Sequence, residues 1–122
     1  MDTTEIRRII QLYFDASYEG SRDKMDQVFH QAAHIYGHAP DGSLNDMPRD
    51  AFVGRMGNRP ADRPTFEREE EILSIDFTGE KTAIARVKLR VYSTRFTDML
   101  CFMELEGKWA VISKVFAGLP VE

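Results

Sequence analysis

The sequence predicts an α+β fold in which three helices from the N-terminal half pack on a curved antiparallel sheet. Two observations carry this prediction. Apolar residues in the first twenty positions recur at helical spacing, whereas the segments after residue 65 alternate between apolar and polar residues, as antiparallel strands do. With 122 residues and 43% hydrophobic content, the chain has the usual size of one domain, so we expect residues 1–122 to form a single domain.

The first helix is predicted to span residues 3 to 19. Its apolar face carries Ile6, Ile9, Ile10, Tyr13 and Phe14. Asp2 and Glu5 have the spacing of a capping box, and Gly20 suits the left-handed residue that ends a helix. Ser21 can then cap a second, short helix. This helix is expected to include Met25, Val28 and Phe29.

A hairpin and a third helix are predicted next. His34–His38 alternates as a strand does, Asp41-Gly42 is a frequent hairpin turn, and a short return strand reaches Leu44. Pro48 fits the first turn of a helix that ends at Gly57. The apolar face of this helix is formed by Phe52, Val53 and Met56. Residues 58–65 contain two prolines and are predicted as a loop.

Four long strands follow, and tight turns link them into a meander. The predicted strands are Phe66–Phe77, Thr82–Tyr92, Phe96–Glu106 and Trp109–Ala117. Gly79-Glu80 and Gly107-Lys108 each place glycine first in a two-residue loop, which a type II′ turn prefers.

The alternation also predicts which side chains face away from the helices. Arg86, Lys88 and Arg90 share one face of their strand, and the opposite face is apolar, so these three are expected to point outward. On the neighbouring strands the expected outer set is Leu100, Phe102, Glu104, Ile112, Lys114 and Phe116. A mixture of charged and large apolar side chains suits a subunit interface, so we expect a homodimer through the outer sheet face. A solvated face with cross-strand ion pairs is the alternative.

Composition excludes several classes of function. A net charge of −4 and a pI near 5.4 argue against binding to nucleic acid. No run of eighteen apolar residues is present and the first five residues are polar and acidic, so we expect neither a membrane span nor a signal peptide, and a cytoplasmic location. Cys101 is the only cysteine, which rules out an internal disulfide.

Three histidines are spaced four residues apart, at His30, His34 and His38. On one helix this spacing would suggest a zinc site, but only His30 is expected on a helix, so we predict no metal site. On the predicted strand, His34, Tyr36 and His38 share one face. If that face is turned inward, the trio offers groups for acid–base chemistry. Alternatively, Tyr36 packs in the core and the histidines lie at the exposed ends of the strand.

The order of elements resembles that of the nuclear transport factor 2-like (NTF2-like) superfamily, a cone-shaped α+β fold. The local sequence is similar to the "Putative lumazine-binding" (SnoaL-like) subgroup at Phe29-His30, Ile35-Tyr36-Gly37, Asp41-Gly42, Met47-Pro48-Arg49 and residues 107–116. The resemblance implies a hydrophobic pocket open at one end and frequent dimerisation through the outer sheet face. It brings no catalytic motif to this chain. The fold occurs in ketosteroid isomerases and polyketide cyclases as well as in non-catalytic binders, so the fold alone does not decide between these functions.

We therefore expect a small-molecule-binding protein whose pocket lies between the helices and the sheet. The candidate ligand-binding residues are Tyr13, Phe14, His34, Tyr36, His38, Phe52, Met56, Cys101 and Ser113. Small residues on the expected inner faces would leave space there: Ala83, Ala85, Ser113 and Ala117. The expected ligand is a small apolar or ring-containing molecule, bound without a cofactor. A metal-independent acid–base enzyme of the isomerase, dehydratase or cyclase type, which would use the His34/Tyr36/His38 trio, and a structural dimerisation module remain as alternatives.

Overall fold

The computed structural model describes residues 1–57 and 66–121. The loop predicted at 58–65 lies outside the described residues. The helices and strands are α1 (Thr4–Glu19), α2 (Arg22–Asp26), β1 (Phe29–His38), β2 (Leu44–Pro48), α3 (Arg49–Gly57), β3 (Glu70–Phe77), β4 (Thr82–Val91), β5 (Thr94–Leu105) and β6 (Lys108–Pro120).

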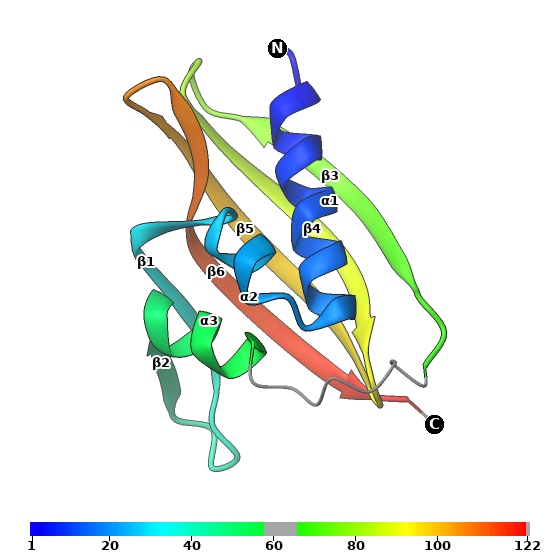
Figure 1. The fold of residues 1–122 in the computed structure, drawn as a ribbon. Coiled ribbons are helices and arrows are strands. Elements are labelled where there is room, and N and C mark those ends of the chain that lie inside the picture. The colour runs from blue at the N-terminus through cyan, green and yellow to red at the C-terminus, as the bar shows by residue number, and fades with distance from the viewer. Residues whose placement is uncertain (58–65, 122) are drawn as a thin grey trace.

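The strands form one mixed sheet in the order β2-β1-β6-β5-β4-β3. From β3 to β6 each strand pairs antiparallel with the next, as the predicted meander requires. β1 and β6 are parallel, so the prediction of a wholly antiparallel sheet is wrong at this junction. The chain leaves the β1-β2 hairpin through α3 and enters the meander at the far edge of the sheet (Figure 1). Parallel neighbours need such a long connection, whereas a hairpin makes antiparallel ones.

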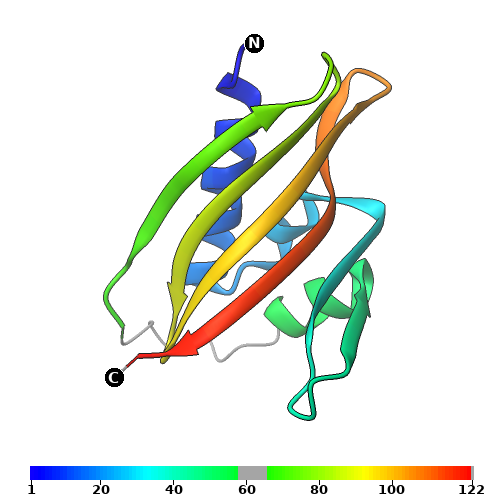
Figure 2. The same cartoon turned by 180° about the vertical axis from the view of Figure 1, so that it is seen from behind.

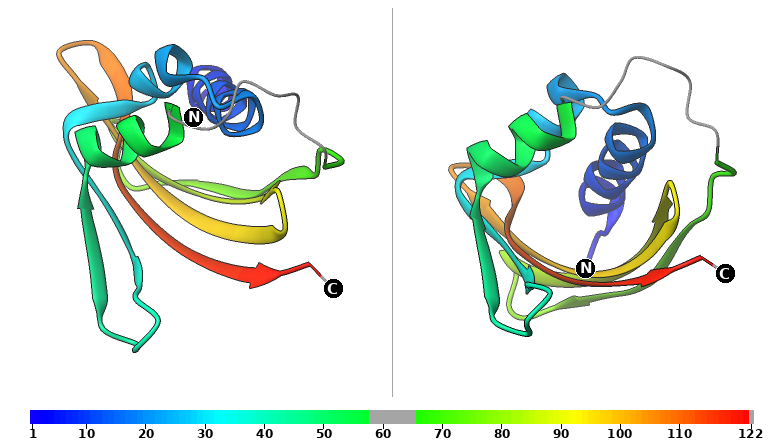
Figure 3. Two further views of the ribbon diagram at one scale, coloured as in Figure 1. Left: turned by 60° about the horizontal axis from the view of Figure 1, so that its bottom comes forward. Right: turned by 90° about the horizontal axis from the view of Figure 1, so that it is seen from below.

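The sheet is curved, and the helices lie on its concave side. α1 crosses the concave face, and α3 covers the end formed by β1 and β2 (Figure 3). The convex face is seen in Figure 2, and none of the described helices covers it. None of the described helices is long and apolar enough to cross a bilayer. Because the helices cover only the concave side, a buried site can form between them and that face of the sheet.

α1 begins and ends where the sequence signals place it. The Asp2 carboxylate accepts a hydrogen bond from the Thr4 N–H at 2.9 Å, and Gly20 ends the helix with a φ of 70°. Glu5 does not complete the predicted capping box, because its carboxylate accepts from Arg8 instead. The predicted apolar face is buried in the core, where α1 packs against α2, β4 and β6.

The second helix is shorter than predicted. Ser21 caps it as expected, accepting from the Lys24 N–H at 3.2 Å, but α2 ends at Asp26. The carbonyl of Val28 already accepts a hydrogen bond from the Val111 N–H of β6 at 3.0 Å. Pairing with the sheet thus takes precedence over helix extension, and His30 lies on β1 rather than on a helix.

The turn between β5 and β6 differs from the prediction by one residue. Its loop is Glu106-Gly107, because β6 begins at Lys108. Both loop residues have positive φ, 52° and 79°, which is typical of a type I′ turn rather than type II′. The strand bounds also move, since β3 begins at Glu70 and β6 continues to Pro120.

A β-bulge in β6 reverses the alternation of its side chains. Cys101 pairs with Ser113, but Phe102 pairs with Val111, so Ile112 is the extra residue. As a result Val111 and Lys114 are both buried on the concave side. The prediction that Lys114 and Phe116 face outward is therefore wrong, and so is the inward placement expected for Ser113 and Ala117.

β5 also faces the opposite way from the prediction. Leu100 and Phe102 are fully buried and belong to the core. Met99, by contrast, is 40% exposed on the convex face. On β4 the prediction is confirmed, since Ala85, Val87 and Leu89 are buried. The core therefore fills the concave side from α1 across β4, β5 and the first half of β6.

Candidate functional site

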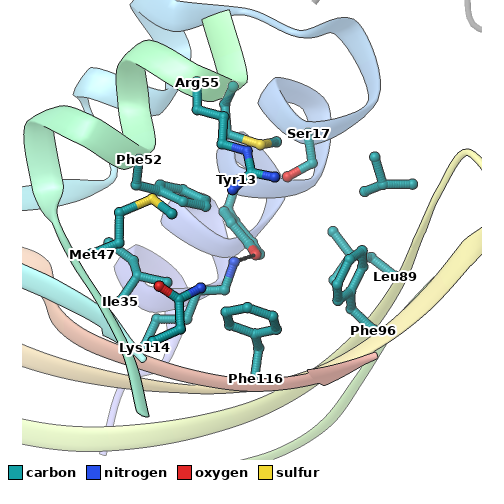
Figure 4. Close-up of a pocket in the computed structure, with 13 residues that line it drawn as sticks. Tyr13, Ser17, Ile35, Met47, Phe52, Arg55, Leu89, Phe96, Lys114 and Phe116 are labelled. Atoms are coloured by element: carbon teal, nitrogen blue, oxygen red, sulfur yellow. Dashed lines mark hydrogen bonds between the residues drawn. The ribbon is translucent and has the colours of Figure 1, made fainter. Parts of the chain in front are cut away.

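A cavity of about 290 Å³ lies between α1, α3, the β1-β2 hairpin and the concave face of the sheet (Figure 4). Its walls are mostly apolar and include Ile35, Phe52, Met56, Leu89, Phe96 and Phe116. Its polar lining consists of Tyr13, Ser17, Asn45, Arg55 and Lys114. Among the described residues that line it, none is an aspartate or glutamate. The cavity therefore combines apolar walls with basic and neutral polar groups.

Two glycines allow aromatic rings that line the cavity to pack directly against the backbone. A Cβ added at Gly37 of β1 would lie 2.7 Å from the Phe116 ring, so the ring occupies the space that a side chain would take. Gly118 does the same for Phe96, whose ring would lie 3.0 Å from an added Cβ. The two rings also pack edge to face, with centroids 5.8 Å apart.

A hydrogen-bonded chain of three polar side chains lies at the floor of the cavity. The Lys114 amine donates to the Tyr13 hydroxyl at 2.7 Å, and that hydroxyl donates to Oδ2 of Asp98 at 2.5 Å. The amine lies 3.7 Å from the same carboxylate oxygen. Tyr13 and Lys114 line the cavity, whereas Asp98 lies behind them and is fully buried.

The surroundings shift the proton affinity of both groups that line the cavity. Burial lowers the pKa of the Lys114 amine, and the Asp98 carboxylate acts in the opposite direction. Burial, followed by the charge of Asp98 and the hydrogen bond to it, raises the pKa of the Tyr13 hydroxyl well above its usual value. Tyr13 therefore remains a proton donor to Asp98 at neutral pH.

Aromatic rings surround the Lys114 amine. Its Nζ lies 4.5 Å from the centroid of the Phe52 ring and 5.2 Å from that of Phe116. Ring faces stabilise a cation that has lost its water, yet they give it no hydrogen-bond acceptor. Oδ1 of Asp98 is also buried without a hydrogen-bond partner among the described residues. The cluster thus retains hydrogen-bonding capacity that its protein neighbours do not use.

The structure places three of the nine candidate residues at this cavity, namely Tyr13, Phe52 and Met56. Phe14 is buried beside Tyr13, with ring centroids 6.3 Å apart, but does not line the cavity. Cys101 and Ser113 pair with each other on the convex side of β5 and β6. Ala85, which was expected to leave space for a ligand, is packed in the core away from the cavity.

The His34/Tyr36/His38 trio shares one face of β1, as predicted, but that face is turned away from the cavity. The neighbouring Ile35 lines the cavity and is buried. His34 stacks on Tyr36 with centroids 6.0 Å apart, and its Nδ1 lies 2.6 Å from Oδ1 of Asp46. None of the three therefore lines the cavity. Within residues 1–57 and 66–121, no cluster of three metal-ligating side chains occurs.

Lys114 and Asp98 are the functional candidates that sequence reasoning missed, since Lys114 was expected on the outer face and Asp98 was not among the candidate ligand-binding residues. Each is the one charged residue in the central part of an apolar strand: Asp98 lies between Phe96 and Leu100, and Lys114 between Val111 and Phe116. Lysine and aspartate are almost never fully buried unless they are paired. Two opposite charges inside adjacent apolar strands are the signal that could have found this pair.

Comparisons with known proteins agree with this architecture. Residues 1–117 match the family described as "Putative lumazine-binding". An NTF2-like protein of unknown function from Silicibacter pomeroyi DSS-3 has a TM-score of 0.82 at 26% identity, covering 98% of this chain and all of that one. Another from Shewanella baltica OS155 has a TM-score of 0.83 at 27% identity, over 98% of both chains.

A curated relative has a named activity. Aldolase FrzH from Cladobotryum sp is 26% identical over 110 residues, which are 88% of this chain and 84% of that protein. The family match covers nearly the whole chain, and each of the two solved structures matches 98% of it. This chain therefore belongs to the family described as "Putative lumazine-binding", and its fold is NTF2-like.

Proposed function

We propose that this protein binds a small ring-containing molecule in the 290 Å³ cavity, with an oxygen atom of the ligand accepting a hydrogen bond from Lys114. A single observation carries the proposal, namely a cavity whose walls are apolar while a buried amine lies at its floor. Ligand sites have this composition, with many apolar contacts and a few polar groups that fix orientation.

The charges around the cavity favour a ligand with a carbonyl or anionic oxygen. Lys114 and Arg55 line it, and the described lining contains no carboxylate. The protein as a whole carries a net charge of −4, so the basic lining is a local feature. An oxygen acceptor at Nζ would give Lys114 a second hydrogen bond and would avoid the repulsion that a cationic ligand would meet.

The first prediction is that flat ring compounds bind in this cavity and that filling it prevents their binding. We choose lumazine as one probe because of the family name, and 2-naphthoate as another, since each joins a flat ring system to oxygen acceptors. Met56→Trp should weaken binding of both by at least about tenfold, or about 1.4 kcal/mol, because the indole would occupy the space of the ligand. Calorimetric titration of the purified protein gives the affinities.

Leu44→Trp is the matched control. Leu44 is 69% exposed and does not line the cavity, so the same indole there should leave binding unchanged. The proposal fails if neither probe binds the wild type, or if Met56→Trp and Leu44→Trp bind equally well.

A metal-independent acid–base enzyme is a second candidate for the same cavity. It is supported by the contact of Lys114 with the Tyr13–Asp98 pair and by the name of the curated relative, an aldolase. In this version the acid–base groups would be Lys114, Tyr13 and Asp98 in place of the histidines on β1. Proton transfer within such a chain needs the short donor–acceptor distances that these three residues have.

We also propose that two copies of the chain associate through the convex sheet face. Met99 and Val115 are each 40% exposed there and lie directly opposite each other on β5 and β6. They replace Phe102 and Phe116 as the expected contacts, because those two side chains face the concave side. An exposed apolar pair at the centre of an uncovered sheet face is typical of an interface between copies.

The second prediction is therefore that Val115→Glu converts a dimer to a monomer, because association would bury an unpaired carboxylate. Sedimentation velocity at micromolar concentration measures the change. Leu44→Glu, an exposed apolar position on β2, is the control and should leave the dimer intact. A wild type that sediments as a monomer at this concentration contradicts the proposal.

A further inference from the structure

We propose that Lys114 forms an imine with an aldehyde or ketone group of a molecule bound in the cavity. The inference rests on the proposed ligand pocket and adds a covalent step and a substrate class to it. Lys114 is the one lysine among the described residues that line the cavity, and its side chain is 7% exposed. A carbonyl group that enters between the apolar walls therefore meets this amine at the floor.

The surroundings of Lys114 favour the form of the amine that can attack a carbonyl carbon. Only the neutral amine has a free electron pair, and lysines that form imines are activated by a desolvated or otherwise unfavourable setting for the ammonium. The faces of Phe52 and Phe116 lie against Nζ and stabilise the ammonium in part, but burial has the largest effect on the amine and lowers its pKa. Asp98 opposes this shift, but it also offers a base that can accept the proton.

A path for that proton is present in the structure. Nζ donates to the Tyr13 hydroxyl at 2.7 Å, and this hydroxyl donates to Oδ2 of Asp98 at 2.5 Å. Both donors point in the same direction along the chain. Transfer of one proton across each hydrogen bond therefore leaves Lys114 neutral and Asp98 protonated, with Tyr13 unchanged.

The reaction balances without an oxidant or a further reactant. The Nζ electron pair forms a bond to the carbonyl carbon and the C=O π electrons move to oxygen. By way of the Tyr13 hydroxyl, that oxygen takes the proton that Asp98 received from the amine, which gives a carbinolamine with a protonated nitrogen and leaves Asp98 as a carboxylate. The nitrogen loses a proton to the Tyr13–Asp98 pair. The same pair returns a proton to the carbinolamine hydroxyl, which leaves as water while the C=N bond forms. Tyr13 and Asp98 thus move protons, and Lys114 is the residue that becomes covalently bonded.

The test traps the imine by reduction. Wild-type protein is mixed with benzaldehyde and sodium cyanoborohydride, and peptide mass spectrometry measures the N-benzyl group at each lysine. Lys88 is exposed on the convex face of β4 and serves as the internal reference, at a protein concentration where the chain sediments as a monomer so that no second copy shields this face. We expect Lys114 to be modified at least about tenfold faster than Lys88. This comparison is made within one molecule and does not require a variant that folds.

A blocked cavity provides the second arm of the test. Met56→Trp should protect Lys114 from modification and leave Lys88 unaffected. Benzyl alcohol, which has the same ring but no carbonyl group, reports on the pocket alone when its binding is followed by ligand-observed NMR.

The outcomes separate the two proposals. If benzyl alcohol binds and Met56→Trp prevents this, but Lys114 reacts no faster than Lys88, the imine is excluded and the pocket remains. If benzyl alcohol does not bind and Lys114 is not modified preferentially, both proposals fail. Selective modification of Lys114 that the Met56→Trp change abolishes supports both.

Discussion

Replacing Lys114 with methionine should lower the free energy of unfolding by about 3–5 kcal/mol, because it leaves the Asp98 carboxylate buried without its cationic partner. No part of the Asp98 surface reaches solvent, so water cannot compensate for the loss of the Lys114 charge. Methionine has an unbranched side chain of similar length and preserves most of the apolar packing against Phe52. Urea denaturation at neutral pH, followed by circular dichroism, measures the loss.

Two further variants distinguish the buried charge from other causes. The double variant Lys114→Met/Asp98→Asn has no charge at this place, and its amide oxygen can still accept from Tyr13, so it should recover most of the lost stability. Lys88→Met removes a lysine from the exposed face of β4 and should change stability by no more than about 0.5 kcal/mol. A Lys114→Met variant as stable as the Lys88→Met variant would mean that the pair is unimportant for stability.

Much of the fold follows from local signals in the sequence. The position of α1 depends on its apolar face and on Gly20, whose left-handed conformation ends the helix. The meander depends on strand alternation and on turn residues, and two turns differ from the prediction. The loop at Gly107 is shifted by one residue, and the loop at Gly79 has three residues in place of two, because the Thr78 N–H donates to the Thr82 carbonyl. These features depend on neighbours within a few residues, which the sequence displays directly.

The faces of β5 and β6 depend on the pairing between strands. A single extra residue, Ile112, reverses the side of every residue that follows it in β6. Without the bulge Lys114 would point to the convex face, and lysine is common on such solvent-facing surfaces. The bulge carries no glycine or proline to mark it, so alternation counted along the chain could not detect it.

The polar residues of the site were not predicted for the same reason, namely that they depend on the pairing between strands. Tyr13, Phe52 and Met56 were expected at a pocket because helical spacing gives the buried face of a helix reliably. Lys114 and Asp98 reach the pocket region only through the correct pairing of β5 with β6, a contact between residues 16 positions apart in the chain. Such register is set by packing of the whole sheet and not by either strand alone.

The alternation on β5 gives the final prediction. Phe102→Ala should destabilise the protein by about 3–5 kcal/mol, because Phe102 is fully buried and its loss leaves a cavity that the core fills only in part. Met99→Ala, on the same strand but 40% exposed on the convex face, should cost less than about 1 kcal/mol. Both are compared with the wild type by urea denaturation, at a protein concentration where all three have the same oligomeric state.

If Phe102 pointed outward, as the sequence alternation suggested, Phe102→Ala would cost less stability than Met99→Ala, because truncating a side chain on an uncovered face removes little packing. A larger loss for Met99→Ala than for Phe102→Ala would therefore show that β5 presents the other face to the helices. In that case Asp98, which shares the face of Phe102, would also point away from Tyr13. The stability of one phenylalanine variant thus tests the register on which the Lys114–Tyr13–Asp98 chain, and with it the proposed site, depends.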